Sequence, residues 1–169
     1  MIEIILDTST ILDITHRSTH TIDELLAKLS MMTRSGERII VEFFRDELGR
    51  ARASDFVRRV TSKIRVIHLF RVAMKQESYR RRREEYTRKL GRVLDRIKSL
   101  LELEKWRYSE ELRSDAFLLI AALAKNGCSK RVCILTSDPG ALKRLEDALR
   151  ALRKEYDCAS RVEAAWAWG

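Results

Sequence analysis

The chain has no run of about 18 uncharged apolar residues, the length that a membrane-spanning helix requires. Its apolar N-terminal stretch, Ile2 to Leu6, is shorter than the core of a signal peptide and contains an acid at Glu3. We therefore expect a soluble, cytoplasmic protein with no membrane association.

Cysteine is also scarce. The three cysteines, Cys128, Cys133 and Cys158, are odd in number, and no two of them form the C-x-x-C pair with which zinc sites usually begin. We expect small buried residues rather than metal ligands.

The chain contains one proline (Pro139), one glutamine (Gln76) and one asparagine (Asn126), whereas charged residues make up 35% of it. This balance is typical of proteins from hot environments, which points to a thermophile. The net charge is +9 and the isoelectric point is near 9.8. Because a basic surface concentrates polyanions, nucleic acid is the partner that this charge favours, although composition alone is equally compatible with an inert basic surface.

The pattern of apolar residues predicts one domain of the α/β class in which strands alternate with helices. Such alternation predicts right-handed βαβ units and a mostly parallel sheet of four or five strands flanked by helices. We expect strands at 2–6, 38–41, 64–69 and 132–136, and helices at 21–34, from 43 to 60, within 72–107, after a cap at Ser109, and around 142–149. Residues 162–168 fit either a fifth strand or a last helix.

Four acids stand where strands end or helices begin. Asp7 follows the first expected strand and Asp138 the fourth, so both should emerge at the carboxyl edge of the sheet, where ligands bind in folds of this kind. Glu47 and Asp115 lie near the starts of two helices. An aspartate after a strand is most often a helix cap, but clustered carboxylates repel one another unless a divalent cation neutralises them. Oxygen ligands suit Mg²⁺ or Mn²⁺, and such ions support hydrolysis of phosphodiesters.

The segments around these acids resemble the motifs of PIN-domain nucleases. The matching segments are residues 4–9 (IILDTS), 39–48 (IIVEFFRDEL), Asp115 with Ala121 and Ala122, and 133–138 (CILTSD). Their order and spacing match over residues 1–150, apart from the basic segment. One departure is Gly140, which stands where many relatives carry another acid.

This resemblance implies a three-layer α/β/α sandwich and a ribonuclease site in which Asp7, Glu47, Asp115 and Asp138 bind Mg²⁺ or Mn²⁺. Glu47 matches the glutamate of the family better than Glu42 does. Further residues would contact the acids or the substrate: Thr8, Ser9, Thr136 and Ser137.

A basic helical arm is expected at residues 72–107, inserted within the domain. Residues 78–107 hold eleven basic and five acidic residues and so carry six of the nine net positive charges. Such a surface binds phosphate backbones without reading bases. The RNA-binding candidates are Arg80, Arg81, Arg82, Arg83, Arg88 and Lys89. The alternative is a solvated helix whose apolar stripe packs on the core, and aromatic residues such as Tyr79 and Trp106 fit either stacking on bases or packing.

We therefore predict a metal-dependent endoribonuclease. The main alternative is a catalytically weak or inactive PIN-like protein that binds RNA or serves as a scaffold, and a phosphatase-like or receiver-type domain fits less well. The arm gives a weaker similarity to minimal protein-only RNase P nucleases, whereas toxin-type PIN ribonucleases usually lack one. A homodimer and an antitoxin partner are left open.

Overall fold

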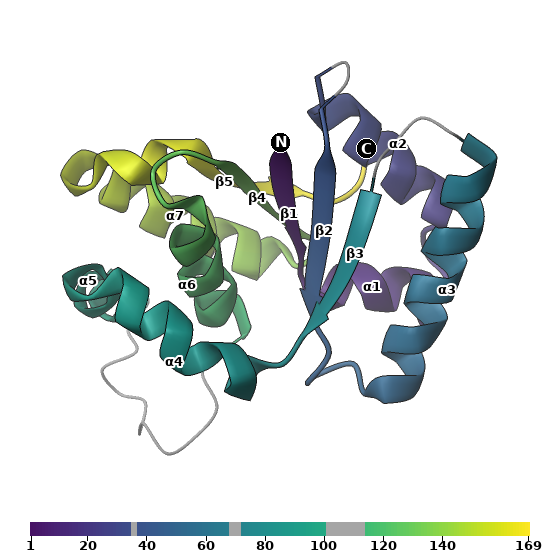
Figure 1. The fold of residues 1–169 in the computed structure, drawn as a ribbon, viewed down its shortest axis with the longest axis horizontal. Helices are drawn as coiled ribbons and strands as arrows, with labels where there is room; N and C mark the ends of the chain where they lie inside the picture. Colours follow the sequence, from purple (N-terminus) through teal and green to yellow (C-terminus); the bar gives the residue numbers. More distant parts are fainter. Residues whose placement is uncertain (35–36, 68–71, 101–113) are drawn as a thin grey trace.

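The computed structural model describes residues 1–34, 37–67, 72–100 and 114–169. Within these ranges five parallel strands form one sheet in the order β3-β2-β1-β4-β5 (Figure 1). The strands are β1 (Ile2–Leu6), β2 (Ile39–Phe44), β3 (Val72–Glu77), β4 (Arg131–Thr136) and β5 (Val162–Trp166). The expected parallel α/β sheet is confirmed, and the ambiguous C-terminal segment is a strand.

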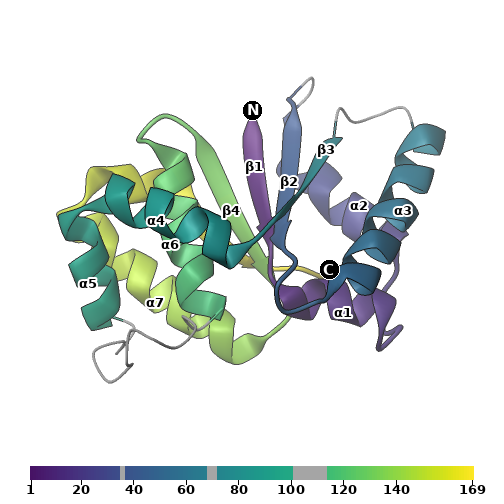
Figure 2. The same cartoon turned by 60° about the horizontal axis from the view of Figure 1, so that its bottom comes forward.

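Helices cover both faces of the sheet (Figures 1 and 2). One face carries α1 (Thr8–Thr15), α2 (Ile22–Met32) and α3 (Arg50–Ile67); the other carries α4 (Tyr79–Leu90), α5 (Arg92–Leu100), α6 (Ser114–Asn126) and α7 (Pro139–Glu155). A short 3-10 helix, η2 (Asp157–Arg161), precedes β5. No helix in the described ranges is long and apolar enough to traverse a bilayer.

Alternate residues of each strand supply the two hydrophobic cores. Ile4 and Leu6 of β1 pack with α1, α2 and α3, whereas Ile5 packs with the helices of the other face. Because successive side chains of a strand point to opposite faces, the nearly continuous apolar run of β1 is buried on both sides.

The third expected strand was misplaced. Residues 64–67 belong to α3 and not to a strand, residues 68–71 lie outside the described ranges, and the third strand is β3, paired with β2 from Ile39 and Val72 onwards. A short run of β-branched residues is compatible with either a helix or a strand. The pairing partners that the folded chain offers decide which of the two forms.

The helix expected from residue 43 begins at Arg50 instead. Phe43 packs in one core and Phe44 in the other, which is the two-residue period of a strand, so β2 continues to Phe44. Glu47 therefore lies in the turn between β2 and α3 and not within a helix. Gly49 closes this turn with a φ of 79°, which favours glycine.

The basic arm is also shorter than expected and is packed. Residues 72–77 form β3, and α4 and α5 meet at Gly91, which has a φ of 52°. The apolar stripe of these two helices is buried in the core that α6 shares; its buried members are Tyr86, Leu90, Leu94 and Ile97. Residues 101–113, including Trp106 and the expected cap Ser109, lie outside the described residues.

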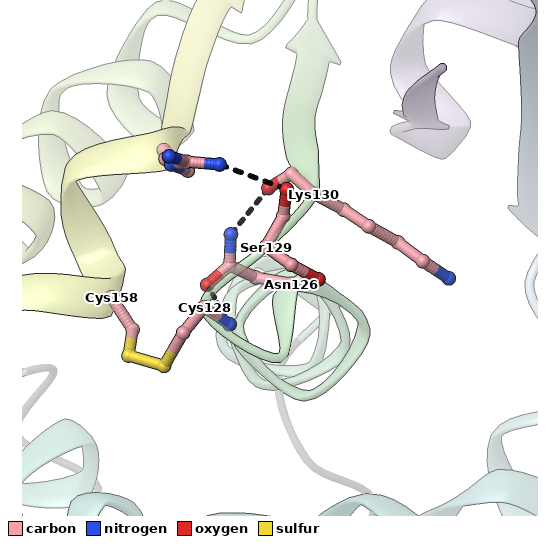
Figure 3. The surroundings of a disulfide bond; sticks show 6 residues. Asn126, Cys128, Ser129, Lys130 and Cys158 are labelled. Carbon is pink, nitrogen blue, oxygen red and sulfur yellow. Dashed lines mark hydrogen bonds between the residues drawn. A yellow bond between two sulfur atoms is a disulfide. The ribbon is translucent and has the colours of Figure 1, made fainter.

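The expectation for the cysteines holds for Cys133 alone. Cys133 is buried in β4, and burial raises the pKa of its thiol. Cys128 and Cys158 form a disulfide with a Cα–Cα distance of 4.4 Å, which ties the loop after α6 to η2 (Figure 3). Sequence spacing does not show this pairing, because the two residues are brought together by the α6–β4 and α7–β5 connections.

Candidate active site

The direction of the chain connections changes between the carboxyl ends of β1 and β4. The chain leaves β1 into α1 on one face of the sheet and leaves β4 into α7 on the other. Ligands of parallel α/β sheets bind where neighbouring strands diverge in this way. Asp7 and Asp138 stand at these two exits, at the N-caps of α1 and α7.

A network of hydroxyl groups holds the Asp7 carboxylate. Asp7 is only 6% exposed, and its Oδ2 accepts hydrogen bonds from Thr136 Oγ1 at 2.7 Å and Ser9 Oγ at 2.9 Å. Ser9 Oγ in turn accepts a hydrogen bond from the Ser137 backbone N–H at 3.2 Å. Ser9 and Thr136, two of the residues expected around the acids, thus both donate to Asp7. Ser137 and Thr8 take part through their backbones, the latter by a hydrogen bond to Asp7.

Burial raises the pKa of Asp7, and the negative charge of Asp138 raises it further. The hydrogen bonds from Thr136 and Ser9 act in the opposite direction without cancelling the effect of burial. The ionised form of Asp7 is thus poorly stabilised by the protein itself. A cation beside Asp7 would stabilise this ionised form.

Asp138 is exposed and also caps a helix. Its Oδ1 accepts hydrogen bonds from the backbone N–H groups of Gly140 at 2.9 Å and Ala141 at 3.1 Å. The ordinary capping role of an aspartate after a strand is therefore real at this position.

Tyr79 connects Glu47 to the same edge. The Tyr79 hydroxyl donates to Glu47 Oε1 at 3.1 Å, and its ring packs on Phe44 and Phe117 with centroid distances of 4.9 and 4.6 Å. Burial raises the pKa of Tyr79, followed in size by the charge and hydrogen bond of Glu47 and then by the charge of Asp7. Tyr79, Glu47 and Asp7 thus share one electrostatic environment at the ends of β1 and β2.

Asp46, beside Glu47, has a separate task that sequence reasoning missed. Its Oδ2 accepts a hydrogen bond from the Tyr79 backbone N–H at 2.7 Å and so caps the start of α4 from another element. This contact anchors the basic helix at the acidic edge of the sheet.

Glu42 lies inside the fold, away from this edge. It is 3% exposed in the middle of β2, pairs with Lys125 of α6, and lies 3.9 Å from Lys75 Nζ. Its charge is therefore matched by an interior lysine. This geometry agrees with the choice of Glu47 over Glu42.

Asp115, the fourth expected acid, is engaged by an arginine. It is 5% exposed in the first turn of α6, and its Oδ2 accepts a hydrogen bond from Arg144 Nε at 2.6 Å. A Cβ atom at Gly140 would lie 3.3 Å from both Arg144 Nη1 and Asp138 Oδ1. The absence of a side chain at Gly140 therefore leaves room for the Arg144 guanidinium between Asp115 and Asp138.

All four expected acids thus lie at one edge, but they are not equally close. Among the described residues, no three His, Cys, Asp or Glu side chains are near enough to hold a metal ion together. Arg144 was not identified from the sequence, although its position four residues after Gly140 places both on one face of α7.

Another buried acid, Asp13, also escaped notice because helix α1 was not expected. Asp13 accepts hydrogen bonds from Arg17 Nη1 at 2.8 Å and Trp168 Nε1 at 3.0 Å. Its partners show a structural role, the attachment of the C-terminal segment to α1.

The basic residues of α4 fall into two groups. Arg82 donates to both carboxylate oxygens of the buried Glu77, at 2.8 and 3.0 Å, and to Glu85 at 2.7 Å. It is a structural residue, and the expectation that it is available to RNA is not supported by this geometry. Lys89 lies 3.4 Å from Glu85. Exposed side chains remain at Arg80, Arg81, Arg88 and Lys89, and Arg83 is partly buried.

Comparisons of the chain with models of protein families, with curated proteins and with solved structures give no match. The resemblance to PIN-domain nucleases therefore depends on the motifs of the sequence alone.

Proposed function

We propose that the protein is a divalent-metal-dependent endoribonuclease that hydrolyses RNA phosphodiester bonds at the carboxyl edge of its sheet. The observation that carries this proposal is the buried Asp7 carboxylate at the carboxyl ends of β1 and β4, whose pKa is raised by burial and by the nearby charge of Asp138. A divalent cation beside Asp7 and Asp138 would stabilise the ionised form of both carboxylates.

The donor set fits Mg²⁺ or Mn²⁺ in its chemistry. Carboxylate oxygens come from Asp7, Asp138 and Glu47, and Asp115 joins them if Arg144 moves aside; such hard oxygen ligands suit these ions. A bound ion would neutralise the acids and lower the pKa of a water molecule that attacks phosphate.

The residues around the acids have positioning roles in this proposal. Ser9 and Thr136 hold one oxygen of Asp7, and Tyr79 orients Glu47 through its hydroxyl group. The Arg144 guanidinium, beside Asp115, would stabilise the acids before an ion binds and would contact a phosphate once displaced.

RNA is the proposed substrate because a basic helix begins at the acidic edge. Tyr79, the first residue of α4, contacts Glu47, and exposed arginines follow at Arg80 and Arg81. A phosphate backbone bound along α4 would be led towards the acids.

A catalytically inactive RNA-binding or scaffold protein is the second candidate. The observation that favours it is the ion pair between Arg144 and Asp115, since an arginine can replace a metal ion as the partner of buried acids. Under this hypothesis RNA binds along α4 and is not cut.

Cleavage of labelled single-stranded and hairpin RNA with Mg²⁺ or Mn²⁺ distinguishes the two. We expect cleavage by the wild type and its loss in Asp7→Asn and Asp138→Asn; asparagine still caps a helix, so the second variant tests charge. Asp147→Asn, at an exposed acid on α7 that pairs with Arg150, is the matched control. Undiminished cleavage in both site variants refutes the site, and RNA binding without cleavage by the wild type favours the scaffold.

We also propose a cytoplasmic location in an organism that grows at high temperature. The high charge content supports the thermal origin. Disulfides are rare in cytoplasmic proteins of mesophiles but common in those of hyperthermophiles, so the Cys128–Cys158 bond is compatible with this proposal.

A further inference from the structure

A second charged site lies at the opposite edge of the sheet from the acids. A cavity of about 470 Å³ opens at the amino ends of β1, β4 and β5, and this volume is in the range of pockets that hold small ligands. Its lining consists of Ile2, Val132, Ser160, Glu163 and four arginines, Arg34, Arg131, Arg153 and Arg161. The lining therefore carries four positive charges and one negative charge.

Two of the arginines are held by neutral groups. Arg153 donates to the carbonyl oxygens of Ala159 at 3.3 Å and Val162 at 2.5 Å, and Arg161 donates to that of Ser129 at 2.9 Å. These carbonyl groups fix the guanidinium groups in place but do not neutralise them. Each guanidinium has five N–H donors, so both arginines keep donors beyond these bonds.

The other two arginines differ. Arg131 Nη1 lies 3.2 Å from Glu37 Oε1, so this carboxylate offsets its charge. Arg34 is exposed at the rim of the cavity. Even after Glu37 and Glu163 are counted, positive charge exceeds negative charge around the cavity.

The disulfide stiffens one wall of this cavity. Cys158 belongs to η2, which carries Ser160 and Arg161, and Cys128 precedes Ser129, the acceptor of the Arg161 hydrogen bond (Figure 3). A wall that is covalently tied loses little freedom when a ligand binds, which favours affinity.

We propose that this cavity binds the phosphate or pyrophosphate group of a small phosphorylated ligand. Guanidinium groups match the oxygens of phosphate in pairs, and Ser160 adds a hydroxyl group. The site is on the other edge of the sheet from Asp7, so this inference does not depend on the proposed nuclease activity.

Pyrophosphate is the probe for the test, in metal-free buffer at constant ionic strength, with binding measured by calorimetry and by the rise in melting temperature. We expect saturable binding by the wild type that weakens about tenfold in Arg34→Glu and in Arg161→Gln. The second variant removes charge but retains an N–H donor for the Ser129 carbonyl. Arg161→Lys, which keeps the charge, should lose less affinity.

Arg150→Glu is the matched control, because it makes the same change in net charge as Arg34→Glu at an exposed position of α7. This variant should bind pyrophosphate as the wild type does. The proposal is overturned if the wild type shows no saturable binding, or if Arg150→Glu weakens binding as much as Arg34→Glu.

Discussion

Arg144 Nε donates a hydrogen bond to Asp115 Oδ2 over 2.6 Å, and the same guanidinium group lies over Gly140, beside Asp138. An arginine thus occupies the region between two of the acids that were expected to bind a metal ion. The pair explains how a buried Asp115 is tolerated without a cation.

Removal of this arginine should increase the affinity for divalent ions. We expect Arg144→Gln to bind Mn²⁺ about threefold more tightly than the wild type. The variant loses the ion pair with Asp115, which competes with the cation by ~0.7 kcal/mol. The rise in melting temperature over a Mn²⁺ titration measures this. Arg150→Gln, on the same helix, should behave as the wild type. An unchanged titration in Arg144→Gln would show that Arg144 does not compete with the ion.

Asp7 should make stability depend on pH. Its pKa in the folded chain lies above the ordinary value of 3.8, so the folded chain holds this proton more tightly than the unfolded chain. Ionisation of Asp7 therefore lowers the free energy of unfolding as the pH rises through the raised pKa. We expect Asp7→Asn to melt at a higher temperature than the wild type at pH 7, and the difference to vanish below pH 3.8.

The same variant should lose its response to metal. Mn²⁺ should raise the melting temperature of the wild type at pH 7 and leave that of Asp7→Asn nearly unchanged, because an amide cannot neutralise the ion. Equal stabilisation of both proteins would exclude Asp7 as a ligand.

Substitutions of Glu42 and Glu47 should affect different properties, stability in the first case and RNA cleavage in the second. Glu42→Gln leaves Lys125 without its buried partner and should lower the free energy of unfolding by about 3 kcal/mol. Glu47→Gln, in an exposed turn, should leave stability unchanged and should reduce RNA cleavage more than Glu42→Gln does. Chemical denaturation and a cleavage assay below the melting transition measure the two effects. The reverse order of cleavage would place the functional glutamate at Glu42.

Substitutions of the α4 arginines should likewise have two kinds of effect, according to what each arginine contacts. Arg80→Ala with Arg81→Ala should weaken RNA binding and reduce the slope of log K against log salt by about 0.7 for each lost phosphate contact. Arg82→Ala should lower the melting temperature instead, because it removes both hydrogen bonds to the buried Glu77. Titrations at several salt concentrations test the first expectation. A slope that is unchanged by the double variant would mean that α4 does not bind RNA.

The disulfide should contribute to stability. Cys128 and Cys158 are 30 residues apart, and closing a loop of that length stabilises a fold by about 3–4 kcal/mol. Denaturation with and without a reductant measures this. The reductant should still lower the stability of Cys133→Ser, which changes the buried free cysteine. It should not change the stability of Cys158→Ser.

Local patterns in the sequence determined those elements in which the apolar pattern and the capping residues indicate the same structure. The apolar runs 2–6 and 132–136 are buried strands, and the Thr21 side chain accepts from the Glu24 backbone N–H at the start of α2, as its position before an apolar helical pattern predicts. Asp7 and Asp138 were found for the same reason, because a residue directly after a parallel strand must lie at the carboxyl edge.

Only the tertiary structure decided the features that depend on partners far apart in the chain. Pairing with β2 made residues 72–77 a strand, and packing on two cores extended β2 to Phe44. Arg144 met Asp115, and Cys128 met Cys158, because the sheet brings α6, α7 and η2 together. Local propensities do not specify such contacts, since their free energy comes from groups that the chain places side by side only after it has folded.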